Sequence, residues 1–155
     1  MSQAQRGPEG KPFFPGSDCL FSITHSRGIA GCAVGCVPVG LDIERVREFS
    51  PGMVEKICTQ REILLTDGEE RDTLLTQLWT CKESHMKLTG LGFSQGLHET
   101  EFCALGAEPR LTGKSRAFFH SASFEHGGKV FWLTLCSAEQ ADFQIDWVEY
   151  AGLTG

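Results

Sequence analysis

Two short segments carry the residues whose types and spacing are best suited to chemistry. The first, GLDIE, predicts a strand with Asp42 and Glu44 on one face, because alternate strand side chains point to the same side. The second, WTCKESHMK, predicts a helix with Glu83 and Lys87 one turn apart on one face. Three carboxylates and an ammonium can therefore converge. Such oxygen ligands suit Mg²⁺ bound together with the phosphates of a substrate.

The residues before Asp42 and Glu44 predict the strands that position this acidic pair. Residues 19–26 alternate well enough for a strand that ends in a polar corner, and Arg27 and Gly28 predict a turn. Residues 29–37 then return as a second strand, and residues 39–44 form a third after Pro38. The acidic pair is thus expected on the third strand.

Helices are expected to follow, and their start and stop signals are clear. Ser50-Pro51 reads as an N-cap followed by proline at the first helical position. Thr59 and Glu62 have the spacing of a capping box. The longest helix is expected to begin near Asp72 and to end at Gly90, a C-cap glycine. This last helix would present the second motif.

The C-terminal third has the texture of β-structure. Strands are predicted over residues 100–105, 115–123 and 129–137, with a hairpin turn at Gly127-Gly128 and a short final strand over 143–150. The expected fold class is α+β, an antiparallel sheet with helices packed on one face.

Composition limits the classes of function. The 155 residues suit one domain, and the net charge of −6 with dispersed basic residues argues against a nucleic-acid binder. No apolar run is long enough to span a membrane, and no signal peptide is evident. The seven cysteines are scattered without a Cys-x-x-Cys pair, which favours buried thiols in a reducing cytoplasm over a zinc site or a disulfide framework.

Each candidate residue, taken singly, also has an ordinary structural interpretation. Asp42 and Glu44 could form a solvated strand edge, and His25 could be a hydrogen-bonded structural histidine. Glu62 could act only as a capping partner, and Lys11 before a proline is ordinarily a solvated loop residue. Only their combination favours a functional site.

Five motifs occur in one order along the chain and together resemble a known family. They are GKP around Lys11, SITHS around His25, GLDIE, the single Glu62, and W-x-x-KES-x-x-K ending at Lys87. The chain resembles the 4′-phosphopantetheinyl transferase superfamily, particularly the surfactin-synthetase-activating type, from Gly10 to about Tyr150. The resemblance implies the fold of that superfamily. It also implies transfer of the phosphopantetheine arm of coenzyme A to a carrier-protein serine, a holo-acyl-carrier-protein synthase activity that releases adenosine 3′,5′-bisphosphate.

Carried over by position, the resemblance assigns the metal and the chemistry. Asp42, Glu44 and Glu83 would bind Mg²⁺. Glu83, directly or through water, would take the proton of the attacking serine, and Lys87 would offset charge on the phosphoryl oxygens.

The resemblance also assigns contacts to coenzyme A. Lys82 and Lys87 would contact its pyrophosphate, with Lys87 favoured of the two. His25 would hold the 3′-phosphate, and Lys11 would sit near the nucleotide.

Members of this type have two similar halves, and the resemblance covers only part of the first. Residues 1–10 are expected to be a flexible arm and 11–155 a single transferase domain. Within it, 11–39 resemble the end of the first half and 40–155 the second half. Basic residues that the first half supplies for coenzyme A are therefore expected to be missing. The hairpin over 20–37 is expected to keep an exposed edge and apolar face, which self-association as a dimer or trimer would cover.

Three functions are weighed on this basis. The preferred one is a cytoplasmic, magnesium-dependent 4′-phosphopantetheinyl transferase whose partners are coenzyme A and an acyl or peptidyl carrier protein, with no nucleic acid or membrane. The second is a truncated, non-catalytic relative that binds coenzyme A or a carrier protein. The third, a metal-dependent phosphohydrolase, lacks a supporting His or Asp cluster.

Overall fold

The computed structural model describes residues 3–8, 10–92, 96–114 and 116–149. Within them the chain forms nine strands and three helices. In chain order these are β1 (Gln5–Arg6), β2 (Pro12–Phe13), β3 (Leu20–Ser26), β4 (Ile29–Gly35), β5 (Val39–Arg45), α1 (Pro51–Ile57), α2 (Gln60–Leu65), α3 (Arg71–Thr89), β6 (Phe102–Ala104), β7 (Arg110–Leu111), β8 (Phe118–His126) and β9 (Lys129–Ser137).

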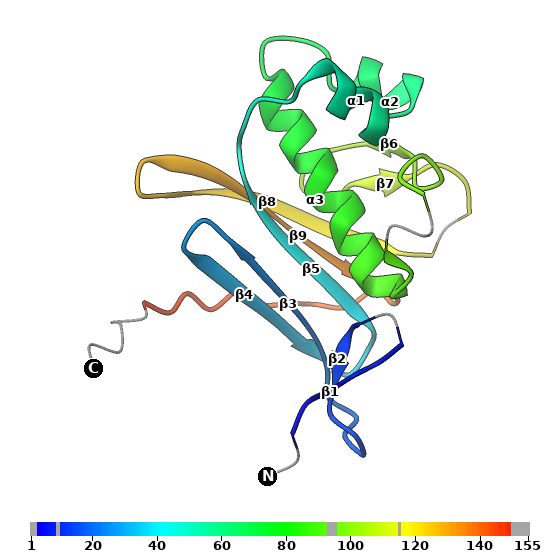
Figure 1. The fold of residues 1–155 in the computed structure, drawn as a ribbon, viewed down its shortest axis with the longest axis vertical. Helices are drawn as coiled ribbons and strands as arrows, with labels where there is room; N and C mark the ends of the chain where they lie inside the picture. Colours follow the sequence, from blue (N-terminus) through cyan, green and yellow to red (C-terminus); the bar gives the residue numbers. More distant parts are fainter. Residues whose placement is uncertain (1–2, 9, 93–95, 115, 150–155) are drawn as a thin grey trace.

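The central element is a three-stranded antiparallel sheet in the order β5-β9-β8 (Figure 1). Helix α3 lies across one face of this sheet, with α1 and α2 beside its first turns. The β3–β4 hairpin forms a separate two-stranded sheet next to β5. The expected α+β class, with helices on one side of an antiparallel sheet, is confirmed.

Gly40 fixes how closely α3 approaches β5. A Cβ at this position would fall on the carbonyl oxygen of Ser84 and close to the amide nitrogen of Leu88, both backbone atoms of α3. Backbone atoms cannot swing aside, so only glycine permits this packing. The glycine of the GLDIE motif therefore seats the helix that carries Glu83 and Lys87 directly above the strand that carries the acidic pair.

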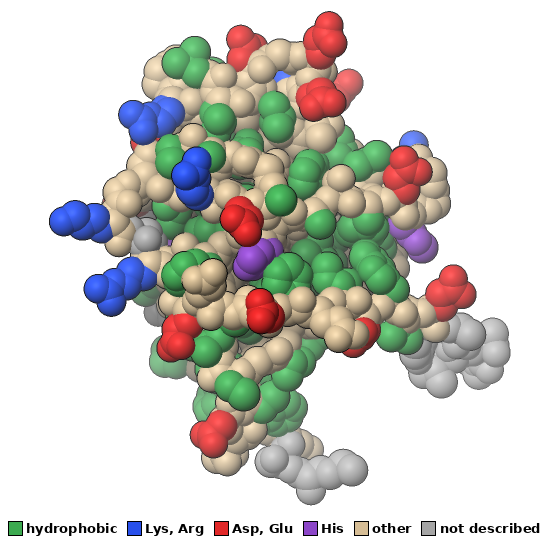
Figure 2. All heavy atoms as spheres, turned by 180° about the vertical axis from the view of Figure 1, so that it is seen from behind, with side chains coloured by type: hydrophobic (Ala, Val, Ile, Leu, Met, Phe, Trp, Pro, Cys, Tyr) green, Lys and Arg blue, Asp and Glu red, His purple; other side chains and the backbone are tan. Residues whose placement is uncertain are grey.

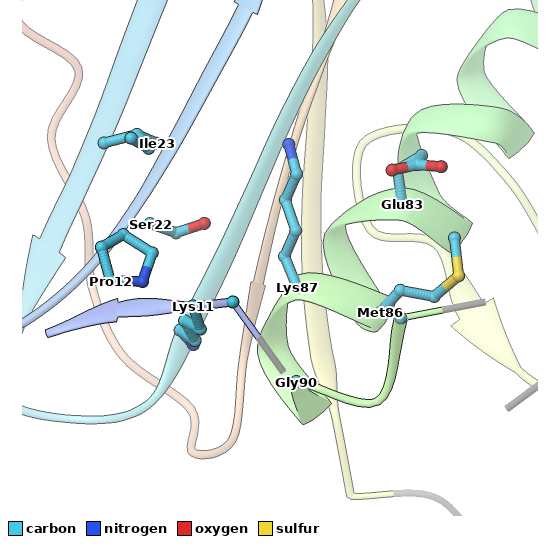
Figure 3. A pocket seen from close by; sticks show the side chains of 10 residues that line it. Lys11, Pro12, Ser22, Ile23, Glu83, Met86, Lys87 and Gly90 are labelled. Atoms are coloured by element: carbon cyan, nitrogen blue, oxygen red, sulfur yellow. The ribbon is translucent and has the colours of Figure 1, made fainter. Parts of the chain in front are cut away.

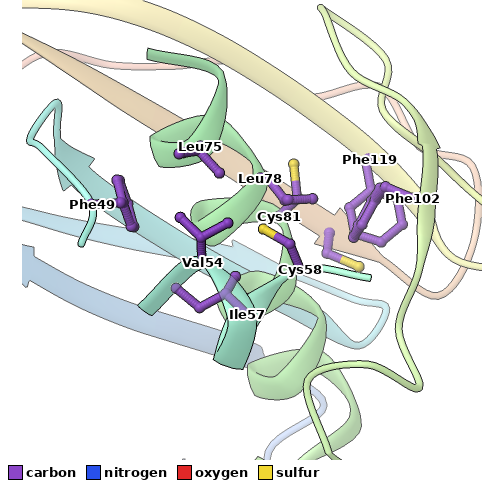
Figure 4. Packing of buried hydrophobic residues seen from close by; sticks show 10 residues of the cluster. Phe49, Val54, Ile57, Cys58, Leu75, Leu78, Cys81, Phe102 and Phe119 are labelled. Atoms are coloured by element: carbon purple, nitrogen blue, oxygen red, sulfur yellow. The ribbon is translucent and has the colours of Figure 1, made fainter. Parts of the chain in front are cut away.

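The main hydrophobic core fills the space between the helices, the sheet and the β6 segment. Its buried members come from all of these elements, and the rings of Phe102 and Phe119 meet edge to face at 5.0 Å (Figure 4). They are Phe49, Val54, Ile57, Cys58, Leu75, Leu78, Cys81, Phe102, Phe119 and Cys136. Leu75 and Leu78, one helical turn apart, are buried and anchor α3 in this core.

A smaller core lies on the opposite face of the sheet, where β3–β4 packs. Leu41 and Ile43 of β5 meet Phe131 and Leu133 of β9, with Ile29 and Ala33 of the hairpin against them. The far side of the hairpin is uncovered in the described part of the chain, as predicted. Its Ile23 and Val34 are 54% and 67% exposed. The face seen in Figure 2 shows further hydrophobic side chains at the surface between scattered charged groups.

Local signals located most elements correctly. Ser50 caps α1 ahead of Pro51, and Thr59 and Glu62 form the capping box of α2. Gly90 ends α3 in the left-handed conformation, and Gly127-Gly128 turns the β8–β9 hairpin. These predictions depend on neighbouring residues only, which is why they succeed.

Two predicted segments differ from the structure. Within the expected flexible arm, Gln5 and Arg6 pair with Pro12 and Phe13 as a small ladder. The predicted final strand is absent over the described residues 143–149, while Tyr150 lies outside the described chain, as does Ser115 at the start of another predicted strand.

Residues 143–149, after β9, contact β8 through aromatic side chains. The ring of Phe143 lies 4.6 Å from that of His120, and the ring of Trp147 lies 4.7 Å from that of Phe124. This segment therefore rests its rings on the outer face of β8, so the aromatic pattern that suggested a strand reflects packing and not strand pairing. No helix in the described ranges is both long enough and apolar enough to cross a membrane.

Candidate active site

Asp42 of β5 lies at the centre of the polar groups above the sheet edge. Its Oδ1 accepts hydrogen bonds from Lys87 Nζ at 2.8 Å and from Thr24 Oγ1 at 3.1 Å. Its Oδ2 is buried and has no hydrogen-bond partner among the described residues. Burial raises the pKa of Asp42 to about 6, although Lys87 and Thr24 favour the charged form. One carboxylate oxygen is thus held in place while the other is left unsatisfied.

Glu83 and Lys87 extend from the same side of α3, one turn apart, as the sequence predicted. Lys87 Nζ also donates to the carbonyl oxygen of Leu41 at 2.9 Å, so its ammonium is fixed on β5. Burial, and then the negative charges of Asp42 and Glu44, raise the pKa of Glu83 to about 7. Glu83 therefore lies within electrostatic reach of the acidic pair and is poised to exchange a proton near neutral pH.

A pocket of about 230 Å³ opens between the start of the chain, β3 and the second half of α3. In Figure 3 Lys87 lies between Glu83 on one side and the hairpin residues Ser22 and Ile23 on the other. Lys11 enters this pocket from the segment before β2 and donates to the carbonyl oxygen of Val39 at 3.0 Å. Burial lowers the pKa of Lys11. The pocket thus combines two ammonium groups with a carboxylate, an arrangement suited to a phosphorylated ligand.

Lys82 does not join this pocket, contrary to the contact expected with a pyrophosphate. Its side chain is fully buried, pairs with Glu62 Oε2 at 2.8 Å and donates to the carbonyl oxygen of Leu97 at 2.7 Å. Adjacent helical residues point about 100° apart, so Lys82 cannot share the face of Glu83. Its position after Leu75 and Leu78, at helical spacings of three to four, was the signal that it faces the core.

Glu62 completes this second, structural cluster. Its two carboxylate oxygens accept from the backbone amides of Thr59 and Phe102 as well as from Lys82. The ordinary interpretation of Glu62 as a capping partner is confirmed. The Lys82 pair extends its role to holding α2, α3 and the start of β6 together.

His25 lies near the end of β3 with an exposed side chain. Alternate residues of β3 face β5, and His25 is on the opposite, exposed face of the hairpin with Ile23. It does not line the pocket that contains Lys11 and Lys87. Its contact with a 3′-phosphate therefore stays a prediction from resemblance.

The metal prediction can be tested against the donor atoms that the chain offers. In the ranges that the structure describes, no three or more His, Cys, Asp or Glu side chains form a group that could hold a metal ion. The expected convergence of three carboxylates is therefore incomplete. The donor chemistry is nevertheless that of a hard divalent cation. Asp42 Oδ2 is buried without a partner in the described chain, and burial, together with the charges of Asp42 and Glu44, raises the pKa of Glu83. Carboxylate oxygens of this kind are ligands that Mg²⁺ accepts when phosphates and water complete its coordination.

Two contributions to the site were not predicted from sequence. Gly40 seats α3 on β5, and the hydroxyls of β3 bind the acidic strand. The alternation of Ser22, Thr24 and Ser26 was a visible signal, because a strand with this period carries all three hydroxyls on one face.

Comparison with known proteins identifies the family of this chain. A profile of the 4′-phosphopantetheinyl transferase superfamily matches residues 38–144. The chain is 33% identical over 110 residues to the 4′-phosphopantetheinyl transferase HetI of Nostoc, which covers 64% of this chain and 46% of that protein. It is 34% identical over 89 residues to the transferase Sfp of Bacillus subtilis, covering 55% of this chain and 40% of that protein. The chain thus spans less than half the length of these relatives.

A solved structure supports the fold. The structure of a holo-(acyl-carrier-protein) synthase from Bacillus anthracis, in complex with CoA (3′,5′-ADP), matches with a TM-score of 0.51 at 17% sequence identity. The match covers 67% of this chain and 97% of that chain. Because the profile also covers more than half of the sequence, the chain belongs to the 4′-phosphopantetheinyl transferase superfamily.

Proposed function

We propose that this chain is a 4′-phosphopantetheinyl transferase with holo-acyl-carrier-protein synthase activity. It would use Mg²⁺ and coenzyme A to modify a serine of an acyl or peptidyl carrier protein. The observation that carries the proposal is the buried Oδ2 of Asp42, which has no partner in the described chain. The other oxygen of this carboxylate accepts from Lys87, which lines a pocket together with Lys11 and Glu83. Metal-dependent transfer of a phosphoryl-bearing arm from a pyrophosphate to a hydroxyl uses such groups, and a purely structural ion pair does not require them.

Asp42, Glu44 and Glu83 would hold Mg²⁺, and the resemblance assigns the pyrophosphate of coenzyme A to the same ion. When bound, the ion would offset negative charge on the phosphoryl oxygens. Lys87 lies beside Asp42 and would bind the same pyrophosphate, while Lys11 would bind phosphate from the opposite wall of the pocket. His25 is retained as a candidate for the 3′-phosphate only on the strength of the resemblance.

The chemical step requires this chain to supply a proton acceptor. The serine oxygen of the carrier forms a bond to the phosphorus that bears the pantetheine arm, and the bond from that phosphorus to the bridging oxygen breaks. Adenosine 3′,5′-bisphosphate leaves with that oxygen. Glu83, directly or through water, would take the serine proton.

A non-catalytic relative that binds coenzyme A or a carrier protein without turnover is the second candidate. The observation that favours it is that no three or more His, Cys, Asp or Glu side chains of the described residues form a group that could hold a metal ion.

One experiment separates these functions. The purified chain is incubated with coenzyme A, Mg²⁺ and an apo carrier protein, and the intact mass of the carrier is measured. A gain of one phosphopantetheine, absent with EDTA and absent for Asp42→Ala, is the expected result. Binding of coenzyme A in calorimetry with no mass gain over a panel of apo carriers would instead identify the non-catalytic relative.

The compartment and the assembly are further parts of this proposal. The seven cysteines are all free thiols, which is consistent with the cytoplasm, where the reaction would take place. Self-association as a dimer or trimer would cover the exposed Ile23 and Val34 of the hairpin. Light scattering at micromolar concentration tests it, and a stable monomer that is active would contradict it.

A further inference from the structure

Strands β3 and β5 run side by side but are joined through side chains. They belong to separate sheets in the described chain, so no backbone ladder links them. Instead, the amide of Leu41 donates to Ser22 Oγ at 3.0 Å, and Thr24 Oγ1 donates to Asp42 Oδ1 at 3.1 Å. Two residues further along both strands, Ser26 Oγ donates to Glu44 Oε2 at 3.4 Å.

The hydroxyls of Ser22, Thr24 and Ser26 form a hydroxyl ladder that lies in register with Asp42 and Glu44 of β5. Thr24 is eighteen residues before Asp42, and Ser26 is eighteen residues before Glu44, so the two strands run parallel at this point. Because all three hydroxyls lie on the face of β3 turned toward β5, each carboxylate receives one of them. The ladder therefore acts on the two acids together.

The contact of Thr24 decides which oxygen of Asp42 is available. The terminal torsion of an aspartate is broad, so an unrestrained carboxylate could turn both oxygens toward the ammonium of Lys87. With Thr24 and Lys87 both on Oδ1, Oδ2 is held free of any partner in the described chain, although it is buried. A buried oxygen without a partner is costly and needs a reason.

We propose that Thr24, and to a smaller extent Ser26, are positioning residues that hold the carboxylates of Asp42 and Glu44 for a divalent cation. The inference rests on the proposed function, because it assumes that the cation site is real. It makes the β3–β4 hairpin, which lies outside the region 38–144 matched by the superfamily profile, part of the site. Partners that orient a metal ligand from behind typically change metal affinity by about 10- to 100-fold.

The test measures cation binding directly. Mn²⁺ is titrated into the full chain, and free Mn²⁺ is followed by electron paramagnetic resonance. Thr24→Val keeps the shape but removes the hydroxyl, and we expect binding weaker by about tenfold or more. Thr24→Ser keeps the hydroxyl and should restore affinity to within about threefold of the original chain, well short of that tenfold loss.

Thr66→Val is the matched control. Thr66 is also buried, and its hydroxyl donates to the carbonyl oxygen of Glu62 at 2.9 Å, away from the acidic pair. Its variant should bind Mn²⁺ as the original chain does. In the transfer assay, Thr24→Val should raise the Mg²⁺ concentration needed for half-maximal rate and keep the rate at saturating Mg²⁺.

The outcomes are distinguishable. Unchanged Mn²⁺ affinity in a folded Thr24→Val overturns the inference and leaves the proposed function intact. If Thr24→Val does not fold, Ser26→Ala, at the end of the ladder beside the half-buried Glu44, gives the decision. Weakened binding supports the inference, and unchanged binding overturns it. A chain that binds no Mn²⁺, or binds it equally well as Asp42→Ala, overturns the cation site and this inference with it. The mass of the carrier protein in the transfer assay decides the proposed function separately.

Discussion

Helix α3 carries two lysines that each form an ion pair of 2.8 Å with a carboxylate, in opposite surroundings. Lys82 and Glu62 are fully buried, and their oxygens and ammonium are shared with backbone groups of three segments. Lys87 lines the pocket and pairs with Asp42, their side chains are 29% and 6% exposed, and Asp42 Oδ2 is left without a partner in the described chain. Every charged atom of the first pair has a partner, and this pair, called saturated below, serves the fold. The second pair leaves one buried oxygen unpartnered among the described residues.

The difference shows how one type of bond serves two purposes. A buried pair that satisfies every donor and acceptor is stable as it stands and needs nothing further. A buried pair with an unsatisfied oxygen is stabilised by whatever cation later binds it.

Lys82→Met should break the saturated pair and destabilise the fold. The substitution leaves the buried charge of Glu62 without its counter-ion, which typically costs about 3–5 kcal/mol of unfolding free energy. Urea unfolding followed by circular dichroism measures the loss. Lys56→Met, at an exposed lysine of α1, is the control and should change stability by less than about 0.5 kcal/mol. Equal stability of the two variants would show that the Lys82 pair is not structural.

Lys87→Met should have the opposite effect to Lys82→Met: transfer activity should be lost, whereas the fold should largely be kept. The ammonium contacts Asp42 at the pocket, and removing one such group from a phosphoryl-transfer site typically costs roughly 100-fold in rate. Its effect on unfolding should be smaller than that of Lys82→Met, because Asp42, whose pKa burial already raises to about 6, can take up a proton instead. The rate of carrier modification and the urea midpoint are both measured. A variant that unfolds as readily as Lys82→Met would remove the distinction between the two pairs.

Glu83→Gln should stabilise the chain at neutral pH while abolishing transfer. Burial and the charges of Asp42 and Glu44 raise the pKa of Glu83 from its ordinary 4.5 to about 7, so the folded chain holds this proton more tightly than the unfolded chain. The stability that the protonated Glu83 side chain contributes is complete below about pH 4.5 and is lost as the pH rises through 7. Melting temperatures in EDTA should therefore be higher for the variant at pH 8, with the difference shrinking toward pH 4.5.

The exposed glutamate Glu55 provides the comparison for that pH series. The Glu55→Gln variant should follow the original chain at every pH. If the melting temperature of Glu83→Gln also matched that of the original chain at every pH, burial and the acidic pair would not raise the pKa of Glu83.

Arg61→Ala should have the smallest effect. Arg61 lies 3.9 Å from Glu101, and its side chain is 63% exposed, so this ion pair is open to water. Such surface pairs typically contribute less than about 1 kcal/mol. A thermal melt that shifts as far as that of Lys82→Met would mean that burial does not separate the ion pairs of this chain.

Much of the fold was predictable because its signals are local. The caps at Ser50 and Thr59, the turn at Gly127-Gly128 and the end of α3 at Gly90 each depend on a few neighbouring residues. The small β1–β2 ladder was missed because two-residue strands carry no periodicity. The predicted strand over 143–150 failed where it can be examined, because an aromatic segment can pack its rings on a sheet without joining it.

The candidate site was predictable only in part. The sequence by itself determined that Asp42 and Glu44 share a strand face and that Glu83 and Lys87 share a helix face, since strand and helix periods fix both. Only the tertiary structure decided that Lys82 turns to Glu62, that Lys87 and Thr24 take the same oxygen of Asp42, and that Oδ2 is left free in the described chain. These contacts join residues 18 to 45 positions apart. They depend on how closely α3 and the hairpin pack on β5, which no local pattern specifies.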